Sequence, residues 1–402
     1  MRKLSLIAAA GLLSMPIASE AKTLNELLVE KGVISAEEAA ASGPARVSYK
    51  HGTRLEFPEQ GFDVKMNLQV QARYSYLDYD ESVAGQNTGI DDVSSFNLRR
   101  VRLSFEGNLL NKQFSYKVQN DFAAGGGGSA LKDAWLQWNW DEAAMLRMGQ
   151  YKVPFSRQEL SSSAKLQFID RSDVSDFFSY GRNRGAMLHG SFGDAGTYAA
   201  GIFNGVSQLS GVSEGENSPG LDNNLMGAAQ VTYNLGDYGS RDEEGDMRKD
   251  GDFAGTMGAA VVYGQGGQTL TAGGSNFNAD FDDVRANVDA GLRVAGFSLQ
   301  SEFYYTNISY DDIDDSDTDF YGMYLQTGYM FVPNEWEGAF RFGFINPDQG
   351  VIDDRQEYSF VLNYFLDGHN LKLQTGISWD VTNFESDDLT DVRYQMQLAG
   401  YF

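Results

Sequence analysis

The sequence predicts an all-β protein, a transmembrane antiparallel β-barrel of about 16 strands. Apolar and polar residues alternate with a period of two over segments longer than the strands of soluble proteins, beginning with Phe62–Tyr76. The connections between these segments are alternately short and long, as in outer-membrane barrels. The 402 residues include 45 Gly, 26 Phe and 21 Tyr but only 7 Pro, a composition that suits many strands and turns.

The N-terminus has the pattern of a secretory signal peptide. The basic start Met1–Lys3 precedes an apolar, Ala-rich stretch over Leu4–Ile17. Ser19–Ala21 matches the small-x-small pattern of a cleavage site. Because the apolar stretch is too short for a membrane helix, we predict a signal peptide over residues 1–21 that is removed after Ala21.

Residues 22–60 are predicted to form a periplasmic segment that is partly helical. Leucines cluster near helical spacing in Thr23–Ser42, and Ser35 and Glu38 have the spacing of a capping box. The helical pattern ends near Gly43–Pro44. The simplest interpretation is that this segment is a small helical element that makes a contact within an oligomer.

Residues 61–402 are predicted to form the barrel, because strand-like alternation recurs in about 16 segments up to the terminal Phe402. Long outer loops are expected at residues 80–95, 205–224, 264–283, 309–318 and 381–390. The 236–252 connection is also long, although its position in the chain predicts a short turn. A soluble β-sandwich or binding module offers no reason for such long strands or for alternating loop lengths.

Charge and composition restrict the function. The chain has 31 Lys and Arg against 56 Asp and Glu, a formal net charge of −25, which disfavours nucleic acid as a partner. Acidic clusters fall in predicted loops, and we expect those of the outer loops to lie among lipopolysaccharide headgroups, bridged by divalent cations. Cysteine is absent, which excludes thiolate metal sites, and we predict no cofactor.

One basic stretch does not alternate. Arg147–Arg184 carries seven Lys or Arg against four Asp or Glu and follows the fifth predicted strand. Pro154 ends the strand pattern because proline cannot donate a ladder hydrogen bond. A connection this long within a compact fold is usually functional, and a barrel of about sixteen strands has a wide lumen. We therefore expect this third outer loop to fold inward and narrow the lumen.

The sequence GQYKVPFSRQELSSSAKLQFIDRSDV, together with the preceding LRRVRLSFEG, resembles the phosphate-selective porin O and P family. The terminal YQMQLAGYF, which ends in Phe402, is similar to the strand signal that the barrel assembly machinery reads. The resemblance covers Phe62–Phe402. It implies a trimer of sixteen-stranded barrels in the Gram-negative outer membrane, a third loop folded into the pore, and an anion-binding arginine ladder with a constriction lysine.

The candidate residues for pore constriction and anion contact follow from that resemblance. Two residues, Arg100 and Arg102, match the strand arginines of the family. Lys117 is a further candidate in the lumen. Four more cations lie in the motif of the inward loop: Lys152, Arg157, Lys165 and Arg171. Two interpretations of the loop cations stay open. They contact permeating anions, or they form a salt-bridge network with Asp170 that fastens the loop to the wall.

We therefore expect a porin, a water-filled channel for passive diffusion of small hydrophilic solutes with a preference for phosphate or polyphosphate. A general or cation-preferring porin, a barrel enzyme and an adhesin are the alternatives. A barrel enzyme needs a nucleophile with a base, and the three histidines, His51, His189 and His369, have no evident catalytic partner in the sequence.

Overall fold

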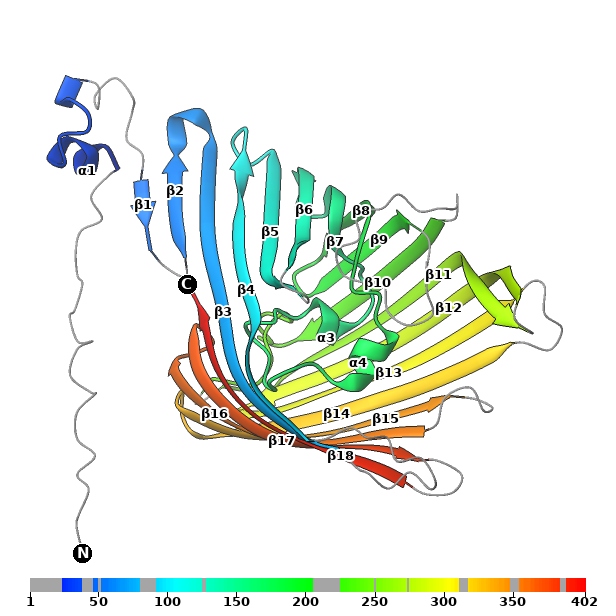
Figure 1. Cartoon of the computed structure of the whole chain (residues 1–402). Coiled ribbons are helices and arrows are strands. Elements are labelled where there is room, and N and C mark those ends of the chain that lie inside the picture. The colour runs from blue at the N-terminus through cyan, green and yellow to red at the C-terminus, as the bar shows by residue number, and fades with distance from the viewer. Residues whose placement is uncertain are drawn as a thin grey trace, which may run out of the picture.

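Sixteen strands form one closed antiparallel barrel in the computed structural model (Figure 1), which confirms the predicted fold class. Each strand pairs with the next along the chain, and the last strand pairs back with the first, from Val392 opposite Asp78 to Tyr401 opposite Gln69. The structure describes residues 24–37, 46–49, 52–79, 92–124, 128–204, 225–248, 251–272, 275–310, 317–347, 354–383 and 388–402.

The barrel strands vary in length from nine to twenty residues. They are β3 (Phe62–Asp78), β4 (Val93–Leu109), β5 (Phe114–Ala124), β6 (Gly128–Asp141), β7 (Ala144–Lys152), β8 (Arg182–Phe192), β9 (Gly196–Asn204), β10 (Leu225–Leu235), β11 (Ala254–Ala272), β12 (Ser275–Val294), β13 (Phe297–Tyr310), β14 (Thr318–Val332), β15 (Trp336–Pro347), β16 (Asp354–Asp367), β17 (Leu371–Asn383) and β18 (Asp388–Tyr401).

The N-terminal segment adds smaller elements. Helix α1 (Leu24–Glu30) lies within the predicted helical stretch, and strands β1 (Arg46–Ser48) and β2 (Thr53–Phe57) pair with each other. Strand β2 also pairs with the start of β3, and the 3-10 turn η1 (Pro58–Gln60) joins the two. The predicted signal peptide and the Glu38 end of the predicted capping box lie outside the described residues. No helix in the described part of the chain has the length and apolarity to cross a membrane.

The two faces of the wall differ as the alternation predicts. Val288 is 53% exposed on the outer face of β12, whereas its neighbours Asn287 and Asp289 are 2% and 5% exposed. Large apolar side chains are exposed on every barrel strand described except β15, as lipid contact requires. Polar side chains alternate with them on the inner face, and several hydrogen-bond to the chain between β7 and β8.

The two ends of the barrel carry different connections. Short turns join β4 to β5, β6 to β7, β8 to β9, β12 to β13, β14 to β15 and β16 to β17. In the turn after β12, Ala295 and Gly296 both have positive φ, 48° and 84°, which matches the right-handed twist of a tight hairpin. This short-turn end faces the periplasm in outer-membrane barrels. The long connection between β10 and β11 lies at the same end.

One predicted long loop is wrong. Residues 264–283 do not form an open loop, because β11 and β12 continue as a paired hairpin up to Ala272 opposite Ser275. This sequence is rich in Gly, Asn and Thr, which hides the apolar alternation. Backbone ladder hydrogen bonds do not depend on that alternation, so the strands extend beyond it. Most of the other predicted outer loops lie outside the described residues.

The 153–181 loop, between β7 and β8, contains two short helices, α3 (Arg157–Leu160) and α4 (Asp173–Phe178). Each begins with a serine cap, because the Ser156 and Ser172 side chains accept from backbone N–H groups three residues on. Several apolar side chains of the loop, Phe155 and Phe178 among them, belong to the larger of two buried apolar clusters. That cluster continues onto the inner face of β8 to β15.

Candidate functional site: a basic cavity beside the 153–181 loop

A cavity of about 1140 Å³ lies between the 153–181 loop and the inner face of β3 to β10. Residues of the 236–252 connection and of the turn between β16 and β17, together with Tyr401 of β18, complete its lining. Seven Lys or Arg and five Asp or Glu side chains line it. The cations are Lys65, Arg102, Lys117, Arg147, Lys152, Lys165 and Arg182, and the carboxylates are Glu106, Asp133, Asp242, Glu243 and Asp367.

Most wall cations of the cavity have a carboxylate partner on another strand. Lys65 and Lys117 flank Glu106, with Nζ to carboxylate distances of 3.6 and 3.4 Å. The Arg102 guanidinium lies 2.7 Å from Asp121 Oδ2. Arg182 of β8 and Asp133 of β6 form a similar pair at 3.0 Å. Strands β3, β4, β5, β6 and β8 thus present paired charges at this part of the wall.

Arg147 differs from these cations. Its Nε donates to Gln137 Oε1 at 2.9 Å, and its guanidinium lies 4.2 Å from the centre of the Trp135 ring and 5.5 Å from that of Tyr151. Among the described residues it forms no ion pair. His189 shares the same Gln137 Oε1 at 2.9 Å. Arg147 is therefore a cation that faces the cavity and is held by an amide and two aromatic rings.

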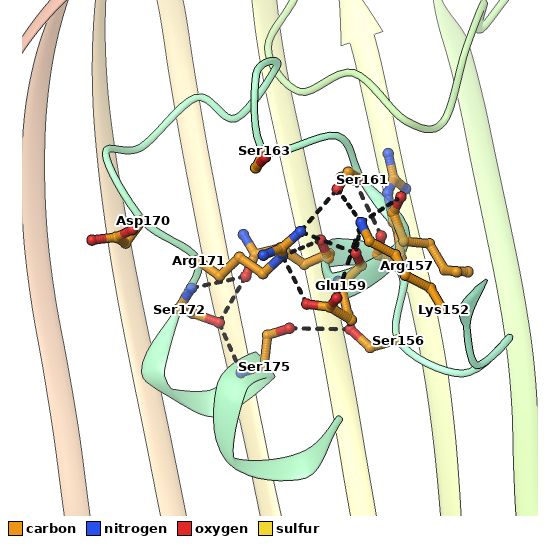
Figure 2. Close-up of polar contacts among 12 residues, drawn as sticks. Lys152, Ser156, Arg157, Glu159, Ser161, Ser163, Asp170, Arg171, Ser172 and Ser175 are labelled. Carbon is orange, nitrogen blue, oxygen red and sulfur yellow. Dashed lines mark hydrogen bonds and ion pairs between the residues drawn. The ribbon is translucent and has the colours of Figure 1, made fainter. Parts of the chain in front are cut away.

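Two other cations hold the loop together from within (Figure 2). Lys152 Nζ donates to the carbonyl oxygens of Glu159, Leu160 and Ser161 at 2.5, 3.3 and 2.9 Å. Arg171 donates to the Glu159 and Ser161 carbonyls as well, at 3.1 and 3.0 Å, and its Nε lies 3.1 Å from the Glu159 carboxylate. The last carbonyls of a helix lack intrahelical donors, so both cations satisfy the end of α3.

The other end of α3 is bound by the wall. Glu302 of β13 is 1% exposed, and its carboxylate accepts the backbone N–H groups of Arg157 and Gln158 at 2.8 and 2.7 Å. The hydroxyl of Tyr324 donates to it at 2.7 Å and the amide of Asn287 at 3.1 Å. A buried carboxylate surrounded by donors fixes where the loop starts its first helical turn.

The side chain of Arg157 contacts β12 and the connection between β10 and β11. Its side chain is 1% exposed, donates to the Tyr238 hydroxyl and lies 3.6 Å from Asp289. A Cβ on Gly291 would meet the Arg157 guanidinium at 2.5 Å. Glycine at this position of β12 therefore leaves the space that Arg157 occupies.

Asp170 joins the far side of the loop to β3 and β4. Arg73 contacts its carboxylate at 2.6 Å, Arg99 at 3.3 Å and Arg100 at 3.6 Å. A register shift between Gln71 and the next pair leaves Arg99 as an extra residue of β4, so that two successive arginines reach one carboxylate. Burial raises the pKa of Asp170, but the three arginines hold that pKa well below its usual range.

Further wall side chains donate to backbone carbonyls of the loop. Arg341 of β15 donates to the carbonyls of Asp170 and Arg171 at 3.1 and 3.2 Å. Lys372 of β17 donates to that of Leu166 at 2.5 Å. On β12, Arg285 donates to the Phe178 carbonyl at 2.8 Å. The loop is thus attached to strands around the wall, β3 and β4 as well as β12, β13, β15 and β17.

The seven sequence-predicted candidates fall into two groups. Arg102, Lys117, Lys152 and Lys165 line the cavity, whereas Arg100, Arg157 and Arg171 do not. The last three are 4%, 1% and 8% exposed and engage wall or loop groups. Sequence reasoning left out the cavity cations Lys65, Arg147 and Arg182, although the first two lie on the inward parity of their strands. It also left out Glu302, for which no local signal exists.

Comparison with known proteins agrees with this architecture. Residues 64–398 match the family described as phosphate-selective porin O and P. An uncharacterized protein of Aquifex aeolicus is 24% identical, and the match covers 99% of both chains.

Solved outer-membrane proteins share the fold at low identity. The outer membrane channel DcaP of Acinetobacter baumannii is 14% identical with a TM-score of 0.61, and the match covers 85% of this chain and 98% of that one. An anion-selective porin from Comamonas acidovorans is 13% identical with a TM-score of 0.57, covering 84% and 99%. Because the family match spans most of the barrel, the chain belongs to the phosphate-selective porin O and P family of the outer membrane.

Proposed function

We propose that this outer-membrane porin forms a water-filled channel for small hydrophilic solutes and prefers anions, phosphate or polyphosphate among them. One observation carries the proposal. The chain has a net charge of −25, yet the cavity beside the loop is lined by more cations than carboxylates. A narrow passage with low-dielectric walls focuses the field of such charges and raises the local concentration of the opposite ion.

From the geometry we propose separate roles for the candidate residues. We assign anion contact to the cations whose side chains line the cavity, first of all Arg147, and with it Arg102, Lys117 and Lys165. Arg147 suits this role because it forms no ion pair within the described part of the chain, and a guanidinium presents paired N–H donors to phosphate oxygens. We assign loop fastening to Arg100, Arg157 and Arg171, and Lys152 belongs with them although it borders the cavity.

The 153–181 loop is the proposed constriction. It hydrogen-bonds to polar groups of the inner wall on both sides of the barrel, so its position is determined by many independent contacts. We propose that solutes pass on the side of β3 to β10, where the cavity lies, since the opposite side is filled by the loop and its apolar cluster.

Assembly is part of the proposal. OmpT of Vibrio cholerae, 10% identical with a TM-score of 0.58 over 85% of this chain, has been solved in a trimer form. We propose a homotrimer in the Gram-negative outer membrane, with lipopolysaccharide around the outer loops and the terminal Phe402 as the signal for the barrel assembly machinery. The family and the barrel fold point to a channel and not to an enzyme.

The test is electrical. Purified protein in a planar bilayer should open in steps, and its reversal potential in a KCl gradient should show preference for chloride. Added phosphate should reduce the chloride current. Cation preference without block by phosphate would refute the anion assignment and favour the cation-preferring porin, while absence of conductance at any voltage would refute the channel.

A further inference from the structure

We propose that Asp242 and Glu243, on the connection between β10 and β11, are selectivity-determining residues of the cavity. They offset the charge of Lys165 and so limit the anion preference of the pore. This inference rests on the proposed channel. It starts from residues 236–248, called the 236–248 segment below, whose length is anomalous for the short-turn end of a barrel.

The 236–248 segment is joined to the 153–181 loop through backbone groups. The N–H of Ser162 donates to the carbonyl of Asp242 at 2.9 Å, and the N–H of Glu244 donates to the carbonyl of Lys165 at 3.0 Å. This reciprocal pair of hydrogen bonds aligns the two stretches side by side. The side chains of Lys165, Asp242 and Glu243 are therefore neighbours as a result of main-chain geometry.

Glu244 locks this alignment. It is 2% exposed, and its carboxylate accepts from the side-chain amide of Gln158 at 3.0 Å and from the backbone N–H of Gln167 at 2.9 Å. The three consecutive acidic residues 242–244 thus have different environments. Glu244 is buried between the loop and the wall, while the two residues before it lie at the cavity.

The wall holds the 236–248 segment from the other side. Arg241 pairs with Asp289 of β12 at 2.6 Å. Arg293 of the same strand donates to the Tyr238 carbonyl at 2.9 Å and to the Glu243 carbonyl, and it lies 4.4 Å from the centre of the Tyr238 ring. Tyr238 is 3% exposed. Because these anchors use backbone groups and other side chains, the Asp242 and Glu243 carboxylates are not needed to position the segment.

Those two carboxylates face Lys165 at the cavity. The side chains of Asp242 and Glu243 are 49% and 33% exposed, and that of Lys165 is 31% exposed. Lys165 Nζ lies 3.7 Å from Asp242 and 3.4 Å from Glu243. All three line the cavity. A single lysine of the loop is therefore matched by two carboxylates, and Glu243 also lies 3.9 Å from His369 Nε2.

The consequence for permeation follows from the cavity charge. Replacing both carboxylates by amides leaves seven cations against three carboxylates around the same space. It also frees Lys165 from its two partners. Both changes raise the positive potential that a passing ion meets. The 236–248 segment thus tunes the selectivity of the loop against which it packs.

The experiment compares reversal potentials in a KCl gradient for the wild type, D242N/E243Q, K165Q and the control D194N/E335Q. The control removes two exposed carboxylates from short turns that do not line the cavity. We expect D242N/E243Q to raise the chloride-to-potassium permeability ratio about two- to fivefold, the range that partly exposed ion pairs support. K165Q should lower the ratio, and the control should leave it within error.

Heat-modifiable migration of each variant in gels confirms that the barrel is folded. A conducting D242N/E243Q pore with the wild-type ratio overturns this inference and leaves the channel intact. A cation-preferring wild type whose D242N/E243Q variant shifts toward chloride supports this inference while refuting the proposed anion preference. A wild type that does not conduct refutes the channel, and this inference with it.

Discussion

Replacing Glu302 by glutamine should loosen the 153–181 loop. The substitution keeps the size of the side chain but turns one acceptor oxygen into an amide group that can only donate. One carboxylate oxygen accepts from Gln158 N at 2.7 Å and from the Tyr324 hydroxyl at 2.7 Å. The other accepts from Arg157 N at 2.8 Å and from Asn287 at 3.1 Å. Either orientation of the amide therefore places its NH₂ group against two donors.

The expected cost follows from those contacts. A hydrogen bond to a charged group contributes about 1.5–3 kcal/mol, so losing two of them weakens the loop attachment by roughly 3–6 kcal/mol. Since 1.4 kcal/mol is about tenfold in an equilibrium constant, the population of the detached loop should rise about 10²- to 10⁴-fold. The barrel itself should remain folded, because its interstrand hydrogen bonds are untouched.

Single-channel recording and limited trypsin digestion measure this change. We expect Glu302→Gln to show greater current noise and a larger mean conductance, together with trypsin cleavage within residues 153–181. Glu335→Gln, an exposed glutamate of a short turn, is the matched control and should behave as the wild type. Wild-type conductance, noise and trypsin resistance in Glu302→Gln would refute the idea that this carboxylate anchors the loop.

Three further results are expected. Arg147→Gln should lower the chloride-to-potassium permeability ratio more than Arg171→Gln does in a KCl gradient, and equal effects would contradict the division between cavity and loop cations. The pKa of Asp170 is held below its ordinary value of 3.8, so its ion pairs should stabilise the loop fully above about pH 4 and be lost as the pH falls further. Single-channel current noise that already rises near pH 6 would contradict this. Val288→Arg, on the lipid face, should cost about 2–4 kcal/mol of barrel stability if it lies near the bilayer midplane, measured by urea unfolding in lipid vesicles with Val288→Leu as the control.

The barrel was predictable because its physical requirements are local. One face of each strand meets lipid and the other meets water or polar groups, so the alternation in Phe62–Tyr76 is visible without any knowledge of neighbours. Closure then follows from the need to satisfy the strand edges. The prediction was wrong at residues 264–283, where strands continue through a sequence that lacks apolar alternation.

The site was less predictable because its contacts are non-local. The position of the 153–181 loop in the chain and its charge are evident in the sequence. Its binding partner Glu302 lies 145 residues after Arg157. Charge alone does not reveal whether an arginine meets a carboxylate, a carbonyl or an open cavity. Arg157 and Arg171 therefore looked equivalent to Lys165, although only Lys165 lines the cavity.

The basic character of the loop has a structural explanation that is separate from selectivity. Lys152 and Arg171 satisfy carbonyls at the end of α3 that have no intrahelical donors, and Arg157 is paired within the wall. Cations of this kind are already bound to other groups of the protein and present little charge to a passing solute. The positive character of the cavity comes instead from Arg147 and the other wall cations, and the 236–248 segment reduces it at Lys165. Substituting the wall cations, Lys165, Asp242 or Glu243 is therefore expected to change the selectivity of this porin. Substituting Lys152, Arg157 or Arg171 is expected to change conductance noise and stability instead.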